Sequence, residues 1–368
     1  MKDILLLTGP TGALGGPLIE ALTSLDSIER IYVLARGPDV EFSIANVEVV
    51  TGDVTRQDLC GLPPHRADEV LAETTAILHG AACTRFDSPL DLARRVNVQG
   101  TRNVLALAAR CRRLNRFGFL STCYVAGKRC GSILEPELAH ASGFVNAYER
   151  SKYEAEEVVR AAANQFPIAI YRLSTILGDS RSGFVRKLAA IHQAIRLCYC
   201  SLMPMIPGTS VSSVDLIASD YAASALRELF CQRFQAGRTY QICGGADSLP
   251  LQDFLEALIS SFLRFRPAWR KRAIAKPALV GLATFELFAR SVEEIGDSAL
   301  AQSVGALKYF APQLAFPKQF DDTECTLALA GSNVVRPSLR EFFPKVVRWL
   351  MENRWGAPRV SERELVPA

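Results

Sequence analysis

The stretch LLLTGPTGALGG, residues 5–16, places Gly9, Gly12 and Gly15 at three-residue intervals directly after an apolar run. In such a turn the first glycine permits the tight bend, the second lets the backbone approach a pyrophosphate, and the third lets a helix pack close to the strand. The N-terminus of that helix offers free N–H groups and a positive dipole end to the phosphates. The stretch therefore predicts a dinucleotide-binding turn, and a plain strand–helix turn is the alternative.

The first half of the chain repeats this alternation of apolar runs and helical patterns. The expected strands cover residues 4–8, 31–35, 47–50, 76–79, 117–121 and 168–172. The expected helices include residues 14–25, 90–112 and 147–165. Strands separated by helices indicate βαβ units with right-handed crossovers. We therefore expect an α/β fold, a Rossmann-like doubly wound parallel sheet with a smaller, mostly helical C-terminal substrate region.

Composition excludes several classes of protein. The 368 residues are 49% hydrophobic and 22% charged with a formal net charge of +4, and the scattered Lys and Arg argue against nucleic acid as a partner. The ten cysteines follow neither a secreted disulfide spacing nor a metal-binding one, so we expect reduced thiols and no metal. The N-terminus lacks the features of a signal peptide, and no apolar run reaches membrane-spanning length. A cytoplasmic protein without a transmembrane segment is expected.

The end of the second expected strand distinguishes NAD from NADP. An acidic residue there binds the ribose 2′-hydroxyl, whereas an arginine accepts a 2′-phosphate. The sequence reads YVLARG with Arg36 at this place, so NADPH is the expected cofactor and a solvated surface arginine is the alternative. After the third strand, TGDVT places Asp53 and Val54 near the adenine, where Asp53 would accept a hydrogen bond from the amino group unless it only forms a turn.

The stretch NAYERSKYEAEEVVR, residues 146–160, places Tyr148 one helical turn before Lys152, on the same helix face. A tyrosine is a poor acid or base near neutrality because its unperturbed pKa is about 10. A nearby ammonium favours the phenolate, so we expect Lys152 to lower the pKa of Tyr148 and let it exchange a proton with an oxyanion. Thr122, at the end of the fifth strand, would orient the substrate carbonyl, and Ser121 is the other candidate for this role. A structural role in capping the end of the strand is the alternative for both.

These motifs together resemble an extended short-chain dehydrogenase/reductase. The likeness rests on the glycine turn, GDVT, HGAA (residues 79–82), the RRVNVQGTRNVL stretch around Asn97, the Ser-Thr pair and YxxxK, and it covers residues 1 to about 245. NAYERSKYEAE and GDSRSGF (178–184) are similar to the subgroup of fatty acyl-CoA reductases and terminal thioester reductase domains. That resemblance implies NADPH as cofactor, catalysis by Thr122, Tyr148 and Lys152, and a structural and proton-relay role for Asn97.

The motif positions and the resemblance define the candidate site. The candidate cofactor-binding residues are Gly9, Thr11, Gly12, Ala13, Leu14, Gly15, Arg36, Asp53, Val54, Ala81, Ala82, Asn97, Ser121, Tyr148, Lys152, Arg172, Leu173 and Thr175. One departure concerns the sixth strand, where the family commonly has Arg-Pro and this chain has Arg172-Leu173. The backbone beside the nicotinamide amide is therefore less closely specified than the rest.

The second half of the chain changes character after Gly178. SLMPMIPGTSVSS (201–213) predicts irregular chain before a helix from Val214, and the sequence from Leu249 onward is mostly helical. We expect residues 1–177 to form the NADP-binding Rossmann domain and residues 178–368 a substrate-binding and lid region, partly interleaved with it. The apolar residues within 202–206 would serve ordinary packing or line an acyl or polyketide pocket.

A basic stretch follows in this second half. It contains Arg264, Arg266, Arg270, Lys271 and Arg272 ahead of an apolar segment. Three interpretations stay open: contact with a membrane surface, reception of an acidic carrier protein or a CoA phosphate, or a helical lid with a solvated basic edge.

The leading functional hypothesis is an NADPH-dependent short-chain dehydrogenase/reductase acting on a hydrophobic carbonyl. The substrate would be an acyl thioester, reduced to an aldehyde or alcohol with Tyr148 as proton donor. Because the first strand begins almost at Met1, we expect the thioester to come on CoA or on a separate carrier protein. One alternative is a ketone/alcohol oxidoreductase acting on a ring-containing secondary metabolite or a steroid-like substrate. Another is a non-catalytic NADP-binding sensor, and a nucleotide-sugar epimerase fits less well. A homodimer is expected by analogy alone.

Overall fold

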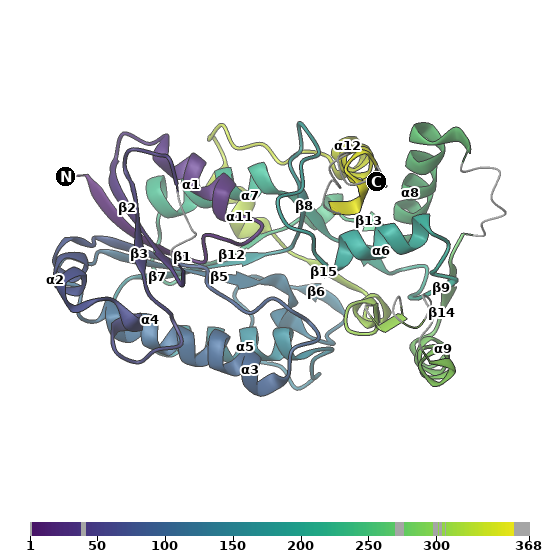
Figure 1. The fold of residues 1–368 in the computed structure, drawn as a ribbon, viewed down its shortest axis with the longest axis horizontal. Coiled ribbons are helices and arrows are strands. Elements are labelled where there is room, and N and C mark those ends of the chain that lie inside the picture. The colour runs from purple at the N-terminus through teal and green to yellow at the C-terminus, as the bar shows by residue number, and fades with distance from the viewer. Residues whose placement is uncertain are drawn as a thin grey trace, which may run out of the picture.

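A seven-stranded sheet forms the centre of the molecule, as Figure 1 shows. The computed structural model describes residues 2–37, 42–268, 276–296, 301, 304, 305 and 307–356. The strands are β1 (Asp3–Thr8), β2 (Ile28–Ala35), β3 (Val47–Thr51), β4 (Ala76–His79), β5 (Arg116–Thr122), β7 (Ile168–Leu173) and β12 (Thr239–Ile242). Their order is β12-β7-β5-β4-β1-β2-β3, and every neighbouring pair is parallel. The order reverses between β1 and β4, the switch point at which doubly wound sheets bind ligands, and this confirms the predicted fold class.

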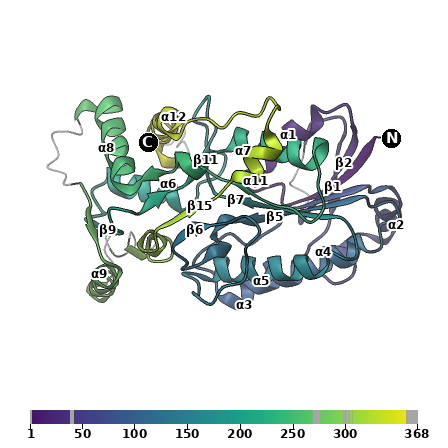
Figure 2. The same ribbon diagram turned by 180° about the vertical axis from the view of Figure 1, so that it is seen from behind.

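Both faces of the sheet are apolar and covered by helices, which is why the strands read as continuous hydrophobic runs. Along β1, Leu5 and Leu7 join the core on one face while Ile4 and Leu6 join the core on the other, as the two-residue period of a strand requires. Figures 1 and 2 show one layer of helices on each face. The first layer contains α1 (Gly15–Thr23), α7 (Ser219–Arg227) and α11 (Thr323–Leu329). The second contains α2 (Pro64–Glu73), α3 (Leu90–Arg94), α4 (Gly100–Ala108) and α5 (Ala147–Ala161).

Three details of this half differ from the sequence prediction. The helix expected over residues 90–112 is interrupted by a π-helical turn, Arg95–Gln99, between α3 and α4. The third expected helix ends at Ala161 rather than at residue 165. The strand β12 was not predicted, because TYQI is a short run of mixed polarity whose burial comes from the segments packed around it.

The second half of the chain adds helices at one end of the sheet. They are α6 (Ala190–Tyr199), α8 (Leu251–Phe265), α9 (Leu282–Ile295) and α12 (Leu339–Glu352), which confirms the mostly helical character expected there. Four two-stranded pairs link the segments between them. These are β8 (Thr175–Gly178) with β11 (Leu216–Ala218), β9 (Met205–Pro207) with β14 (Ala278–Val280), β10 (Ser213–Val214) with β13 (Leu249–Pro250), and β6 (Gly131–Ile133) with β15 (Lys318–Phe320).

The stretch at residues 201–213 is therefore less irregular than predicted, since it contains β9 and begins β10. The helix expected from Val214 starts instead at Ser219, after β11. The boundary proposed at residue 177 stays a prediction, and the chain beyond it supplies α7 and β12 to the sheet layers.

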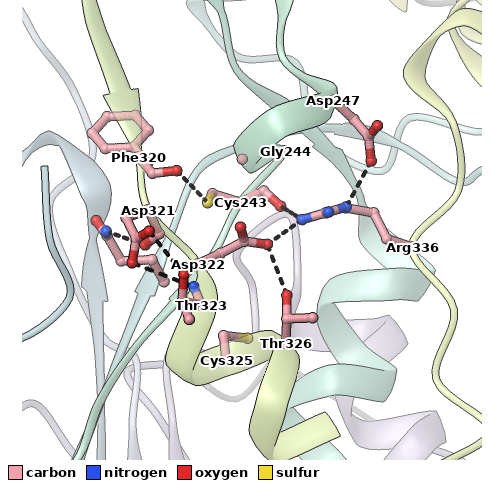
Figure 3. A network of polar contacts seen from close by, with 12 residues as sticks. Cys243, Gly244, Asp247, Phe320, Asp321, Asp322, Thr323, Cys325, Thr326 and Arg336 are labelled. Atoms are coloured by element: carbon pink, nitrogen blue, oxygen red, sulfur yellow. Dashed lines mark hydrogen bonds and ion pairs between the residues drawn. The ribbon is translucent and has the colours of Figure 1, made fainter. Parts of the chain in front are cut away.

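A polar network joins the C-terminal part of the chain to the end of β12 (Figure 3). Arg336 donates through Nη1 to the Cys243 carbonyl at 3.1 Å, forms an ion pair with Asp322, and donates through Nε to Asp247 at 3.2 Å. The Cys243 thiol lies 3.8 Å from the Phe320 carbonyl oxygen. Residues 320–336 are therefore fixed against the end of β12, although about eighty residues separate Phe320 from Cys243 in sequence.

Candidate active site

The glycine turn lies after β1, at the switch point of the sheet. Gly9 has φ +82°, and a Cβ there would lie 2.5 Å from the carbonyl carbon of Gly80. At Gly15 a Cβ would lie 1.8 Å from the Pro10 oxygen, so the first turn of α1 packs directly on the loop. Both positions therefore require glycine, one for its backbone conformation and both for close approach. The helix has no side-chain N-cap and no acidic residue in its first turn, which leaves its N-terminus open to an anion.

A buried chain of polar groups links this turn to the HGAA segment. Thr8 Oγ1 accepts from the backbone N–H groups of Gly80 and Ala81, both at 3.1 Å, and lies 2.7 Å from His79 Nδ1. His79 Nε2 lies 3.0 Å from the Thr101 hydroxyl. Burial, with a contribution from Lys152, lowers the pKa of His79 to about 3, so the ring is neutral. Thr8 and His79 were not among the predicted site residues, although their places beside the first glycine and at the start of HGAA were a usable signal.

Asn97 fixes the loop after β4 to helix α5. Its Oδ1 accepts from the Cys83 N–H at 2.7 Å, and its Nδ2 donates to the Ser151 hydroxyl at 2.8 Å. Thr101 donates to the Asn97 carbonyl at 2.6 Å within the π-helical turn, a distortion often found at functional sites. Asn97 therefore joins two parts of the candidate site, and the predicted Ala81 and Ala82 lie in the loop that it holds.

The predicted adenosine-binding residues follow β2 and β3. Arg36 comes directly after β2, is exposed, and forms no ion pair with any described residue. Asp53 Oδ1 accepts from the Thr55 N–H at 2.8 Å. The carboxylate therefore stabilises a turn, which was the alternative to binding the adenine. Its other oxygen has no hydrogen bond within the described part of the chain. The Val54 carbonyl accepts from Asn103 Nδ2 at 2.8 Å, which holds this loop against α4.

Thr122, Tyr148 and Lys152 come together where α5 lies along β5. Thr122 ends the strand and is buried; its hydroxyl accepts from the Tyr124 N–H at 3.3 Å and is near enough to the Tyr148 hydroxyl to lower the pKa of that group. Lys152 is buried; its Nζ donates to the Leu120 carbonyl at 2.8 Å and lies 4.2 Å from the centre of the Phe119 ring. The structure thus brings together all three residues that the sequence assigned to catalysis.

The electrostatics of this group differ from the sequence expectation. Burial raises the pKa of Tyr148 to about 12, and the interaction with Thr122 offsets only part of the rise. Burial lowers the pKa of Lys152 to about 7, although the Glu156 carboxylate favours the ammonium. The expectation that Lys152 lowers the pKa of Tyr148 is therefore wrong for this arrangement, because desolvation dominates both groups and the ammonium is directed to a backbone carbonyl.

The neighbouring Ser121 has a different partner on α5. Its hydroxyl donates to Glu156 Oε2 at 2.6 Å, inside a buried network in which Arg172 donates to both Glu156 oxygens. Arg172 also donates to the carbonyls of Glu135 and Glu137, at 3.2 and 2.6 Å. Ser121 and Arg172 could therefore offer a cofactor only their backbone, and Thr122 is the hydroxyl that faces Tyr148.

The remaining predicted residues lie at the same edge of the sheet. Leu173 pairs in register with Thr122 on β5. The Thr175 hydroxyl donates to the Tyr124 hydroxyl at 3.2 Å. Thr11 is exposed, Gly12 and Ala13 are half-buried, and Leu14 caps α1 through its backbone.

Hydrophobic groups adjoin the Tyr148 side of the site. The ring of Phe86 lies 5.4 Å from that of Tyr148 and stacks on Phe310 at 5.9 Å. Phe310 in turn lines a small apolar cavity of about 40 Å³ between α6, α8 and residues 307–314, and every described side chain lining it is hydrophobic. Met203 and Ile206, which were predicted to pack or to line a pocket, are among these lining residues.

The basic stretch of the second half is only partly described. Arg264 and Arg266 are exposed at the end of α8, whereas Arg270, Lys271 and Arg272 lie outside the described residues. No described helix combines the length and apolarity needed to cross a membrane. Among the described side chains, no group of three His, Cys, Asp or Glu is placed to bind a metal ion.

Comparison with known proteins places the chain in a family. Residues 39–226, just over half of the chain, match the model of an NAD-binding family described as "Male sterility protein". An adenylate-forming reductase of Aspergillus terreus is 28% identical over 267 residues, which cover 61% of this chain and 24% of that protein. An alcohol-forming fatty acyl-CoA reductase of Simmondsia chinensis is 29% identical over 161 residues, covering 36% of this chain and 33% of that protein. The matched region thus spans only a quarter to a third of these relatives.

Solved structures share the fold. The terminal R domain of the myxalamid PKS-NRPS biosynthetic pathway superposes with a TM-score of 0.79 at 24% identity, covering 96% of this chain and 92% of that one. A thiolation-reductase di-domain of an archaeal non-ribosomal peptide synthetase gives 0.72 at 18% identity, covering 97% and 77%. The chain belongs to the male sterility family of NAD(P)-binding proteins, within the extended short-chain dehydrogenase/reductases that include fatty acyl-CoA reductases and terminal reductase domains.

Proposed function

We propose that this protein is an NADPH-dependent reductase that converts an acyl thioester to an aldehyde, and from there to an alcohol if a second hydride follows. The observation that carries the proposal is the meeting of Thr122, Tyr148 and Lys152 at the carboxyl edge of the sheet. A structural role alone would not require a tyrosine hydroxyl paired with a threonine hydroxyl at the place where this fold binds its ligands.

The residues at the switch point fit a dinucleotide. The open N-terminus of α1 and the absence of side chains at Gly9 and Gly15 suit a pyrophosphate, and Arg36, which forms no ion pair with a described residue, suits a ribose 2′-phosphate. Within the described part of the chain, one Asp53 carboxylate oxygen has no partner and is free to accept from an adenine amino group. Bound NADPH would supply the hydride.

The hydroxyls of Thr122 and Tyr148 would bind the carbonyl oxygen of the substrate. As hydride reaches the acyl carbon, the oxygen gains negative charge, which the Thr122 and Tyr148 hydroxyls stabilise by hydrogen bonds. With a pKa of about 12, Tyr148 is protonated near neutrality and therefore suited to donate a proton to the alkoxide. The resulting hemithioacetal then breaks its carbon–sulfur bond to give the aldehyde and a free thiol, so one thioester consumes one NADPH and one proton.

An aliphatic acyl group is the substrate favoured by the surroundings of Tyr148. The rings of Phe86 and Phe310 give the Tyr148 side of the site an apolar surface, which suits an acyl chain, whereas the cavity beyond Phe310, of about 40 Å³, is too small to hold one. The names of the relatives, which include fatty acyl-CoA reductases and a thiolation-reductase di-domain, support CoA or a carrier protein as the thiol. A homodimer and the cellular compartment stay expectations.

The test follows NADPH oxidation and thiol release together. With acyl-CoA thioesters of increasing chain length we expect one thiol per NADPH in the first reduction. Tyr148→Phe should lower kcat by about 10²–10⁴-fold while NADPH binding is retained. Tyr153→Phe, a tyrosine of the same helix that packs against His140 and Phe144, is the matched control and should stay active. Consumption of a ring ketone with no thiol from any thioester would reject the proposal, and an equally active Tyr148→Phe variant would reject the mechanism.

A further inference from the structure

Glu149, the residue after Tyr148, is buried in the first turn of α5 with only 1% of its surface exposed. Asn146 caps the helix by accepting from the Glu149 N–H at 3.0 Å. The Glu149 carboxylate accepts in return from the Val145 N–H at 2.9 Å and from Asn146 Nδ2 at 3.0 Å. Reciprocal bonds of this kind stabilise helix N-termini and work equally well at the surface. Helix capping alone therefore does not explain why this carboxylate is removed from water, which costs free energy.

The additional partners of this turn come from the C-terminal part of the chain. Gln313, itself buried, donates through Nε2 to Glu149 Oε1. The Gln313 Oε1 accepts from Lys318 Nζ at 2.7 Å, and Lys318 also donates to the Gly127 carbonyl. Asn146 Nδ2 donates to the Tyr309 carbonyl at 3.0 Å. The segment Tyr309–Lys318 is thus attached at several points to the turn that carries Tyr148, from more than 160 positions away in sequence.

The same segment carries Phe310, which stacks on Phe86 beside the Tyr148 ring and lines the apolar cavity. Any shift of the segment along α5 would move Phe310 relative to Tyr148. The side-chain amide of Gln313 donates to Glu149 and accepts from Lys318, so only one orientation satisfies both contacts. Buried polar contacts with a single satisfied arrangement can select one register among several, as polar residues do in coiled coils.

We propose that Glu149 and Gln313 are positioning residues, which fix the register of the segment Tyr309–Lys318 on the first turn of α5 and so place the apolar wall of the acyl site against Tyr148. The inference rests on the proposed function for its link to the acyl group, whereas the attachment of the segment is independent of any activity.

The test uses the full chain and three variants. Glu149→Gln places an amide N–H₂ beside the donors of Gln313 and Asn146. Gln313→Leu removes the contacts of Gln313 with Glu149 and Lys318, while the cap of α5 stays intact. The double variant Glu149→Gln with Gln313→Glu exchanges the two groups and lets the new carboxylate pair with Lys318. Glu157→Gln, which changes an exposed carboxylate on the same helix, is the matched control.

Two measurements are compared. Hydrogen exchange of residues 309–318 should be faster than in the wild type in both single variants and unchanged in the control. In the double variant its rate should return at least in part to that of the wild type. With an acyl-CoA, kcat should fall by about 10–100-fold in the single variants while NADPH affinity is unchanged, because misplacement by about 1 Å costs such factors. The double variant should recover most of this loss.

Unchanged hydrogen exchange of the segment in Gln313→Leu would overturn the proposal. So would a double variant that recovers neither the hydrogen-exchange rate nor kcat. A loss of NADPH affinity in step with kcat would also overturn it, since the effect would then be general. A wild-type protein that reduces no thioester would contradict the proposed function instead, and the exchange measurement would still decide whether the segment is held as described.

Discussion

Arg172 offers a sharp test because the structure gives it a role unlike the predicted one. Its guanidinium is fully buried and donates to both oxygens of Glu156, which is also fully buried, and to two backbone carbonyls. Arg172→Met would leave the Glu156 carboxylate with Ser121 and the partly exposed Arg160 as partners. We therefore expect a loss of stability with little change in cofactor affinity.

The magnitude follows from the burial of the pair. Removing one partner of a buried ion pair costs about 3–5 kcal/mol, and a buried carbonyl that loses its donor costs about 1–3 kcal/mol. Because Arg160 lies 3.0 Å from Glu156 and can still compensate its charge in part, while two carbonyls lose a donor, we expect a loss of at least about 3 kcal/mol. Against a total stability of about 5–15 kcal/mol, such a variant should fold but unfold at much lower urea.

Urea unfolding followed by circular dichroism measures this loss. The double variant Arg172→Met with Glu156→Gln removes both charges and should be more stable than the sum of the single effects predicts, by about 1–3 kcal/mol. Arg238→Met breaks an exposed pair with Glu324 and should cost less than about 1 kcal/mol, which makes it the matched control. Weak NADPH binding in Arg172→Met with unchanged unfolding would refute the reasoning and restore a direct cofactor role.

Three further changes test the candidate cofactor site. Gly9→Ala should destabilise the fold by more than about 1 kcal/mol and abolish NADPH binding, because φ is +82° and the Cβ would meet Gly80; Gly281→Ala, with open space and an ordinary φ, is the control in thermal melts and binding titrations. Arg36→Ala should weaken NADPH by about 10–100-fold and leave NADH unchanged, as loss of a hydrogen bond to a charged group predicts, and equal losses for both would contradict the 2′-phosphate assignment. Since the pKa of Lys152 is lowered to about 7, its ammonium, which we expect to bind the cofactor, is lost as pH rises through that value, so kcat/KM for NADPH should fall above about pH 7. Lys152→Met should give a low, flat profile, and a wild-type profile that stays level to pH 9 would count against the role of the charge.

Much of the fold could be predicted because its signals are local. Strands buried on both faces produce uninterrupted apolar runs. The glycine turn is recognisable because its backbone conformation and close contacts require glycine at Gly9 and Gly15. The strand β12 has no such signal. Gln241 within it is fully buried only because its side chain donates to the carbonyls of Ile133 and Asp321, which come from distant segments.

The residues of the candidate site could be predicted from the sequence, but the directions of their side chains could not. The sequence predicted that Arg172 lies at the end of a strand near the nicotinamide position, yet not that its side chain turns to Glu156 in the core. It likewise could not supply the burial that raises the pKa of Tyr148 and lowers that of Lys152. Such quantities depend on which groups surround a side chain, and those groups come from several elements.

The contacts of α5 explain why the motif extends beyond Tyr148 and Lys152. Glu156 follows Lys152 by the same four residues, so all three side chains lie on the helix face that meets β5. Tyr148 contacts Thr122, Lys152 binds the Leu120 carbonyl and Glu156 binds Ser121. The hydroxyls of Ser121 and Thr122 thus have different partners on the same face of α5. The choice between them is therefore set by Glu156: once it holds Ser121, Thr122 is the hydroxyl left to face Tyr148.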